Sequence, residues 1–182
     1  MMHKIFLILG LIFSISFDDG LRVLQDLKSE SSLYDNEISD AMITIVDDRF
    51  ITAKIRCDIL LKKSKETTIL KDSVIAKFYN EGDPISELKS DIATYKENFT
   101  LKANKNISIY NLETKDSLFF VNQEDAEIIW DENYNRITSD KEFILLTEDG
   151  CASGLSFESD VDLSNIKITS IRGTNQKDPC AN

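Results

Sequence analysis

The sequence predicts an all-β domain, either a sandwich or an open, rolled sheet. The clearest observation is a period of two between residues 51 and 59, where Ile, Ala, Ile, Cys and Ile alternate with Thr, Lys, Arg and Asp. Alternation of this kind is typical of a strand with one buried face. Short apolar runs of the same type recur along the chain, separated by turns rich in Asp, Asn and Gly. This spacing is typical of all-β folds.

The first 17 residues have the pattern of an export signal. Lys4 supplies a positive start, residues 5–17 form an apolar run, and two aspartates end it. The run of 13 residues is short for a transmembrane helix, which needs roughly 20 residues, and it suits a signal peptide. The small residues Ser14 and Ser16 fit cleavage after Ser16. The alternative is an uncleaved, short membrane anchor, and in both cases the remainder is expected outside the cytoplasm.

Residues 18–39 are mixed and polar, and we expect them to connect the signal to a β-domain at 40–173. A polar tail follows at 174–182. No confident amphipathic helix is found after the signal. The expected strands begin with one from residue 40 and continue at 51–59, 69–78, 85–95, 100–110, 119–121, 126–130, 136–147, 155–163 and 166–171.

An internal repeat accompanies the strands. Aspartates recur at Asp58, Asp91, Asp125 and Asp160, at intervals of 33, 34 and 35 positions (58 to 91, 91 to 125, 125 to 160). Each unit reads as a strand, a turn and a return strand. A β-unit that does not bury its own face must stack on its neighbours, so the repeat predicts a continuous apolar face along the stack.

That continuous face is the candidate binding region. If it is open, it forms a trough that admits acyl chains, because each buried methylene contributes about 0.8 kcal/mol. If it is closed, it is simply the core. The sequence leaves both alternatives open. The candidate lining residues are Ile51, Ala53, Ile55, Leu88, Leu101, Ala103, Ile107, Ile109, Trp130, Phe143, Leu145 and Phe157.

A stack of strands also leaves an unpaired edge at each end. The last expected strand is short, and its isoleucines at Ile166, Ile168 and Ile171 are weakly guarded by charge. We expect this edge either to bind a partner by β-augmentation or to be an ordinary edge strand.

Composition excludes several function classes. The formal net charge of −11 and the isoelectric point near 4.6 argue against binding nucleic acid, which requires a basic surface. The only histidine is His3, inside the expected signal, so the commonest general base is missing from the mature domain. The four repeated aspartates are better explained as strand-end residues than as a carboxylate pair. We therefore expect no catalytic residues, no cofactor and no metal site.

The three cysteines Cys57, Cys151 and Cys180 do not form an even disulfide framework. Cys57 lies in an alternating strand and is expected to be a small buried residue. A Cys57–Cys151 bridge is the alternative in an oxidising compartment.

One segment carries a family resemblance. Residues 154–160 read Gly-Leu-Ser-Phe-Glu-Ser-Asp, and an Ile-Lys-Ile strand follows at 166–168. This arrangement resembles the C-terminal G-x-x-F-x-S-D pattern of the LptC family. The blocks at 88–95 and 101–107 are similar to the same family, so the resemblance covers about residues 40–173.

The resemblance implies a twisted β-jelly-roll that is open along one side, with two facing antiparallel sheets. It implies a non-enzymatic role in lipopolysaccharide export and cell envelope biogenesis. The protein would lie in the periplasm, associated with the inner membrane. It would receive lipopolysaccharide from LptF/LptG-type transporter subunits at its N-terminal edge and pass it to an LptA-like bridge protein at its C-terminal edge, with the acyl chains in the trough. The rival hypothesis is an exported structural or adhesive β-sandwich without a lipid ligand.

Overall fold

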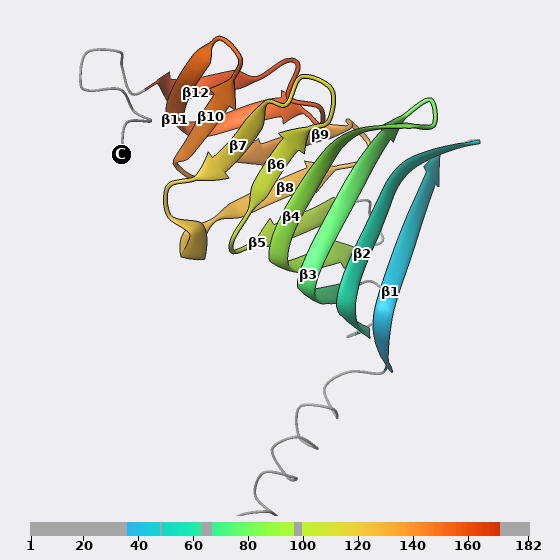
Figure 1. The fold of residues 1–182 in the computed structure, drawn as a ribbon. Coiled ribbons are helices and arrows are strands. Elements are labelled where there is room, and N and C mark those ends of the chain that lie inside the picture. The colour runs from blue at the N-terminus through green and yellow to red at the C-terminus, as the bar shows by residue number, and fades with distance from the viewer. Residues whose placement is uncertain (1–35, 48, 63–66, 97–99, 172–182) are drawn as a thin grey trace, which may run out of the picture. The chain divides into compact units, whose positions relative to one another are not determined.

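The computed structural model of the protein describes residues 36–47, 49–62, 67–96 and 100–171. The described residues form an all-β fold in which twelve antiparallel strands belong to one sheet (Figure 1). In chain order the elements are β1 Asn36–Asp47, β2 Phe50–Lys62, β3 Thr67–Asn80, β4 Asp83–Lys96, β5 Thr100–Asn104, β6 Ser108–Asn111, β7 Ser117–Phe120, the short 3-10 helix η1 Gln123–Asp125, β8 Glu127–Asp131, β9 Arg136–Ser139, β10 Phe143–Thr147, β11 Gly150–Asp160 and β12 Lys167–Ile171.

Some of the segments that were predicted from the sequence are not described by the structure. The expected signal at 1–17, most of the connector and the tail at 174–182 lie outside the described residues. Within the described part, no helix combines the length and hydropathy that a membrane span needs.

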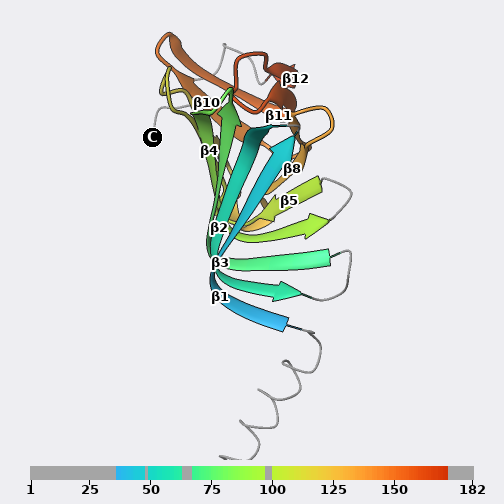
Figure 2. The same cartoon turned by 90° about the vertical axis from the view of Figure 1, so that its right-hand side faces the viewer.

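Two long strands divide the sheet into two arms. The first half of β4 pairs with β6, and its second half pairs with β5. In the same way, the first half of β11 pairs with β10 and its second half with β9. We call the part containing β5, β8 and β9 the β5 arm, and the part containing β6, β7 and β10 the β6 arm. Figure 2 shows strands diverging from a common bend into two directions.

The hydrogen-bonded path closes on itself. It runs β4-β5-β8-β9-β11-β10-β7-β6, and the β4–β6 pairing returns it to its start, so these strands form a barrel. The expectation of a sheet open along one side is therefore wrong for this part of the chain. The physical reason is that β4 and β11 are long enough to belong to both arms.

Strands outside the closed path extend the sheet at both ends. β3, β2 and β1 follow one another beyond β4, and β12 pairs with the other edge of β11. Within the described residues, β1 pairs with β2 alone and β12 with β11 alone. The sheet thus ends in two edge strands, as the sequence predicts.

Each pass of the chain bends at the same level, which we call the corner. Asp40, Asp72 and Ser73 have positive φ values of 50°, 59° and 50°, and so do Lys105 and Asn106 at 63° and 48°. Aspartate and asparagine tolerate this left-handed region better than most residues. The bends let one strand cross from one arm to the other.

Backbone hydrogen bonds hold neighbouring passes together at the corner. The amide of Asp91 donates to the carbonyl of Lys105 (3.1 Å), Lys105 donates to Ala126 (3.2 Å) and Asn106 donates to Gln123 (3.0 Å). These bonds replace strand pairing where the sheet turns, so the bent backbone stays satisfied.

The aspartate repeat is largely a repeat of this corner. Asp91 accepts a hydrogen bond from Asn106 (2.7 Å), and Asp125 accepts one from Lys141 (3.1 Å). Asp58 lies at the register shift of β2 between Arg56 and Ile59. Asp160 breaks the pattern, because it ends β11 far from the corner.

The core fills the space between the arms. Register-matched rows of apolar residues run across the strands, and a shared register places their side chains on one face. One row crosses the β6 arm and the other crosses the β5 arm. The first contains Ile43, Ile55, Ala76, Leu88, Ile109, Leu118 and Leu145, and the second contains Ile38, Leu60, Leu70, Ala93, Ala103 and Ile128.

Strand boundaries differ from the sequence predictions in three ways. The expected strand at 155–163 is β11, which begins at Gly150 and ends at Asp160, so Val161 and Leu163 lie in the connection that follows. The first strand begins at Asn36 rather than residue 40, so the end of the expected connector is part of the sheet. The expected strands 100–110 and 136–147 are each split in two, because the chain turns the corner inside them.

Gly154 generates the first testable prediction. A Cβ atom here would lie 2.4 Å from Cγ2 of Ile168 and 3.0 Å from the Phe143 ring, because β11 is flanked by β10 and β12 at this point. We expect Gly154→Val to lower the free energy of unfolding by about 2 kcal/mol, measured by urea denaturation. Most of that loss should disappear when the change is made in an Ile168→Ala background. An equal loss in both backgrounds would contradict this explanation.

Candidate functional site

Eleven of the twelve predicted lining residues belong to the buried core. Their exposed fractions run from 0% to 6%, and Ile51 is half-buried. Aromatic rings fill the space between them: the ring centroids of Phe143 and Phe157 are 4.9 Å apart. Along most of its length the interior is therefore a packed core.

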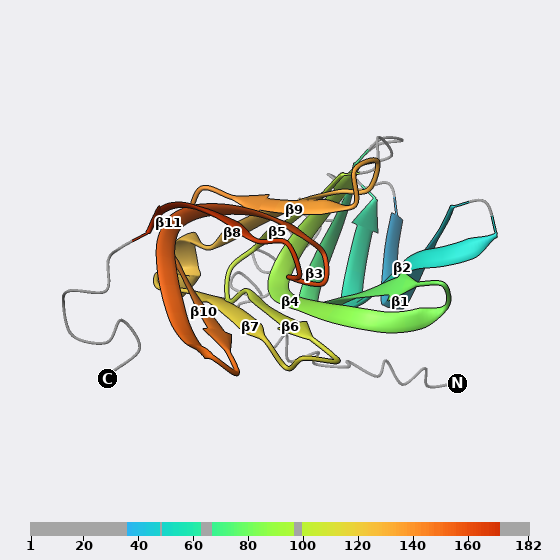
Figure 3. The same cartoon turned by 90° about the horizontal axis from the view of Figure 1, so that it is seen from above.

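The side opposite the corner, where the two arms end, is closed by contacts between them. We call this side the mouth. The hydroxyl of Ser86 on β4 donates to the carbonyl of Val161 (2.5 Å). The amide nitrogen of Asn111 on β6 donates to the carbonyl of Asp162 (2.6 Å). Figure 3 shows the β11–β12 connection reaching from the end of β11 toward β4.

Apolar side chains of the same connection strengthen the closure. Val161 is 1% exposed and Leu163 is 5% exposed. Leu163 adopts a positive φ of 63°, which is unfavourable for a leucine and occurs where packing compensates for it. The connection therefore acts as a plug between the arms.

A second contact crosses the mouth nearer to the N-terminal strands. The rings of Trp130 on β8 and Phe78 on β3 meet edge to face, with centroids 5.0 Å apart. Beyond Trp130, burial raises the pKa of the Glu132 carboxyl, and the negative charge of Asp47 raises it further. The carboxylates of Glu132 and Asp47 therefore repel each other between the β8–β9 turn and the end of β1.

The interior is uncovered at the β1 end. Ile38 shares a face with Leu60 and with Leu70, which is 0% exposed, yet Ile38 itself is 51% exposed. Among the described residues, the second apolar row therefore continues to the last strand and ends in an exposed side chain.

The C-terminal edge is better covered. Ile166 and Ile168 are partly buried against the core, and Ile171 pairs in register with Gly154. Between them, Lys167, Thr169 and Ser170 are exposed. This edge is polar outside and apolar inside.

Three of the four defined positions of the Gly-x-x-Phe-x-Ser-Asp segment, Gly154, Phe157 and Asp160, have a structural explanation. Gly154 provides space for Ile168, and Phe157 packs on Phe143. Ser159 is 0% exposed. Asp160 accepts a hydrogen bond from Asn165 (2.6 Å) and pairs with Arg136 (3.7 Å).

The cysteines occupy different environments. Cys57 is a free, buried thiol. Burial raises its pKa, Asp58 raises it further, and a backbone hydrogen bond from Lys71 opposes the shift, so the thiol is poorly reactive. Cys151 is disulfide-bonded. The alternative Cys57–Cys151 bridge is therefore wrong.

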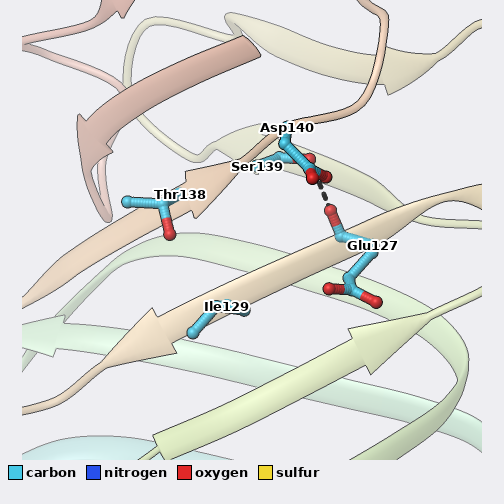
Figure 4. A pocket seen from close by; sticks show the side chains of 5 residues that line it. All are labelled: Glu127, Ile129, Thr138, Ser139 and Asp140. Atoms are coloured by element: carbon cyan, nitrogen blue, oxygen red, sulfur yellow. Dashed lines mark hydrogen bonds between the residues drawn. The ribbon is translucent and has the colours of Figure 1, made fainter.

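A surface depression of about 320 Å³ lies on the outer face of the β8–β9 hairpin (Figure 4). Its lining consists of Glu127, Ile129, Thr138, Ser139 and Asp140. Ser139 donates to the Glu127 carbonyl (2.5 Å), which ties the two strands together. Among the described residues, no group of three or more His, Cys, Asp or Glu side chains is arranged to hold a metal ion.

Sequence reasoning missed the residues that close the mouth. Ser86 and Val161 are 75 positions apart, and Asn111 and Asp162 are 51 positions apart. No local pattern connects such residues. The sequence signal for the closure of the mouth was a pair of apolar residues, Val161 and Leu163, that stand among polar residues.

The mouth generates the second prediction. Ser86→Ala removes the donor to Val161 and leaves a buried carbonyl without a partner, which costs about 1–3 kcal/mol. Urea denaturation should show this loss. Ser90→Ala is the matched control on β4, because its hydroxyl bonds only to nearby Ile92 (3.2 Å). Equal losses in the free energy of unfolding in the two variants would mean that the hydrogen bond of Ser86 across the mouth contributes no more than the local hydrogen bond of Ser90.

Glu132 generates the third prediction. Its pKa is raised in the folded state, so the folded protein binds more protons than the unfolded chain. Its contribution to stability is present at low pH and is lost as the pH rises above the ordinary value of 4.5. Glu132→Gln should therefore reduce this loss of stability between acidic and neutral pH, measured by thermal unfolding across that range. Asp47→Asn should remove only part of this pH-dependent loss of stability, because burial of Glu132 remains. If the wild type and Glu132→Gln lose stability in parallel as the pH rises, the prediction is contradicted.

Comparison with protein-family models finds no match, and comparison with curated proteins finds none either. The resemblance to the LptC family therefore stays a prediction from the sequence. Function must be inferred from the fold, the interior and the edges.

Proposed function

We propose that this protein is an exported, non-enzymatic lipid carrier of the LptC type with a β-jelly-roll fold. It acts in the periplasm at the inner membrane. It receives lipopolysaccharide from an inner-membrane transporter and passes it to a bridge protein. The acyl chains enter between the two arms, where the packed core opens to admit them, while the sugars stay in water.

One observation carries this proposal: the apolar interior reaches the β1 edge without being covered. Ile38 faces the interior side of the sheet and is 51% exposed, although it continues a buried apolar row. We infer that a partner or ligand covers this side chain. A neighbouring β-protein docked on β1 would continue both the sheet and the interior, so that chains pass from one to the next.

Two further observations support the proposal. Both ends of the sheet are edge strands, which suits β-augmentation by a transporter domain at β1 and a bridge protein at β12. The disulfide at Cys151 is of a kind that persists in oxidising compartments such as the periplasm.

The fourth prediction tests lipid entry at the β1 end. A photocrosslinking amino acid at Ile38 should form adducts with lipopolysaccharide, because this side chain continues an interior row. The matched control is Met42, which lies on the same strand, pairs with the exposed Arg56 and is 66% exposed. We expect several-fold more adduct at Ile38 than at Met42, measured on denaturing gels with lipopolysaccharide detection.

Equal labelling at Ile38 and Met42 would mean that lipid binds both faces of β1 without a preference for the interior face. Absence of adducts at both positions, in a protein that unfolds cooperatively, would favour the structural or adhesive β-sandwich instead.

A further inference from the structure

Unpartnered polar atoms gather at the mouth. In the described part of the chain, four buried side-chain atoms have no hydrogen-bond partner: Gln123 Oε1, Trp130 Nε1, Glu132 Oε2 and Ser159 Oγ. The last three belong to the end of the β5 arm. Trp130 pairs with Ile137, and Ile137 pairs with Ser159, so the backbones of Trp130 and Ser159 lie about 10 Å apart and their side chains share the interior face.

These unpartnered atoms lower the stability of the protein when no ligand lies in its interior. Trp130 and Ser159 are both 0% exposed, and a buried polar atom without a partner is destabilising. Other buried polar side chains at the mouth are satisfied, since Ser86 and Asn111 donate to the plug. Phenylalanine and alanine would fill the two positions without this penalty.

The chemistry of Trp130 and Ser159 defines what binds there. The indole Nε1–H is only a donor, so it requires an acceptor. The Ser159 hydroxyl also donates. Around them lie the apolar side chains of Phe78, Leu101 and Ile137. The complementary group is an acceptor oxygen attached directly to a hydrocarbon chain.

We propose that Trp130 and Ser159 form a polar subsite for the carbonyl oxygen of an ester or amide that joins an acyl chain to its head group. The chain runs into the apolar interior, and the head group leaves through the mouth. The subsite therefore sets how deep an acyl chain enters. It rests on the proposed function, because it requires an acylated ligand in the interior.

The experiment uses two probes that differ only in the carbonyl: monododecanoyl glycerol and dodecyl glyceryl ether, both below their micelle concentrations. Trp130 is the only tryptophan of the chain, so its emission reports on the subsite directly. We expect wild type to bind the ester about fivefold more tightly than the ether, as one hydrogen bond allows. The Trp130 emission should shift with the ester more than with the ether.

Two variants test whether Trp130 and Ser159 cause the preference for the ester over the ether. Trp130→Phe, measured by calorimetry, and Ser159→Ala, measured by Trp130 emission, should each bind the two probes with nearly equal affinity. Ser159→Ala should not lower the melting temperature, because it removes an unpartnered hydroxyl, so it tests the subsite even if Trp130→Phe folds poorly. Ser153→Ala, a buried serine elsewhere on β11, is the control and should retain the ester preference.

The outcomes separate the subsite from the carrier role. If wild type binds both probes equally, or if Ser159→Ala retains the preference, the subsite is wrong while lipid carriage stands. If neither probe nor lipopolysaccharide binds to the folded protein, the proposed function fails and the subsite fails with it.

Discussion

The structure depends on one constraint: every pass of the chain bends at the same level. Because side chains alternate along a strand, a bend displaced by one residue would turn the apolar row of that pass outward. The bends at Asp40, Asp72 and Asn106 keep the rows aligned from β1 to β12. Backbone bonds between Asp91, Lys105 and Ala126 secure the turn. Two arms with one shared interior follow from this alignment.

The sequence predicts much of this fold. The alternation at 51–59 locates β2 with its buried face. The aspartate repeat marks three corner positions, where Asp91 and Asp125 accept hydrogen bonds from neighbouring passes. The split of 100–110 into β5 and β6 was not predicted, although Asn106 is of a residue type that tolerates the left-handed backbone it adopts there. Eleven of the twelve predicted lining residues are buried, but many other core residues, such as Leu70, Phe78 and Ile128, were not predicted. The closure of the interior by Val161 and Leu163 was not predicted either, because it depends on partners distant in sequence.

A closed mouth and a lipid-carrying interior are compatible if the mouth opens locally. Two side-chain hydrogen bonds, a plug of two apolar residues and one aromatic pair hold it, whereas the corner and the strand pairings hold the rest. Regions with fewer interactions open at lower free energy than the whole protein. Under the proposed function, a lipid that enters the interior would contact the exposed apolar end at β1 and accept hydrogen bonds from Trp130 and Ser159.

Hydrogen exchange at the mouth tests this account most directly. The Leu163 amide bonds to the Asp160 carbonyl within the plug, whereas the Asp91 and Asn106 amides bond at the corner. When lipopolysaccharide is added, the account predicts faster exchange at Leu163 and unchanged protection at the corner. Unchanged exchange at Leu163 while lipid is bound would show that the interior does not open at the mouth. Faster exchange at both places would show that lipid unfolds the protein instead of entering it.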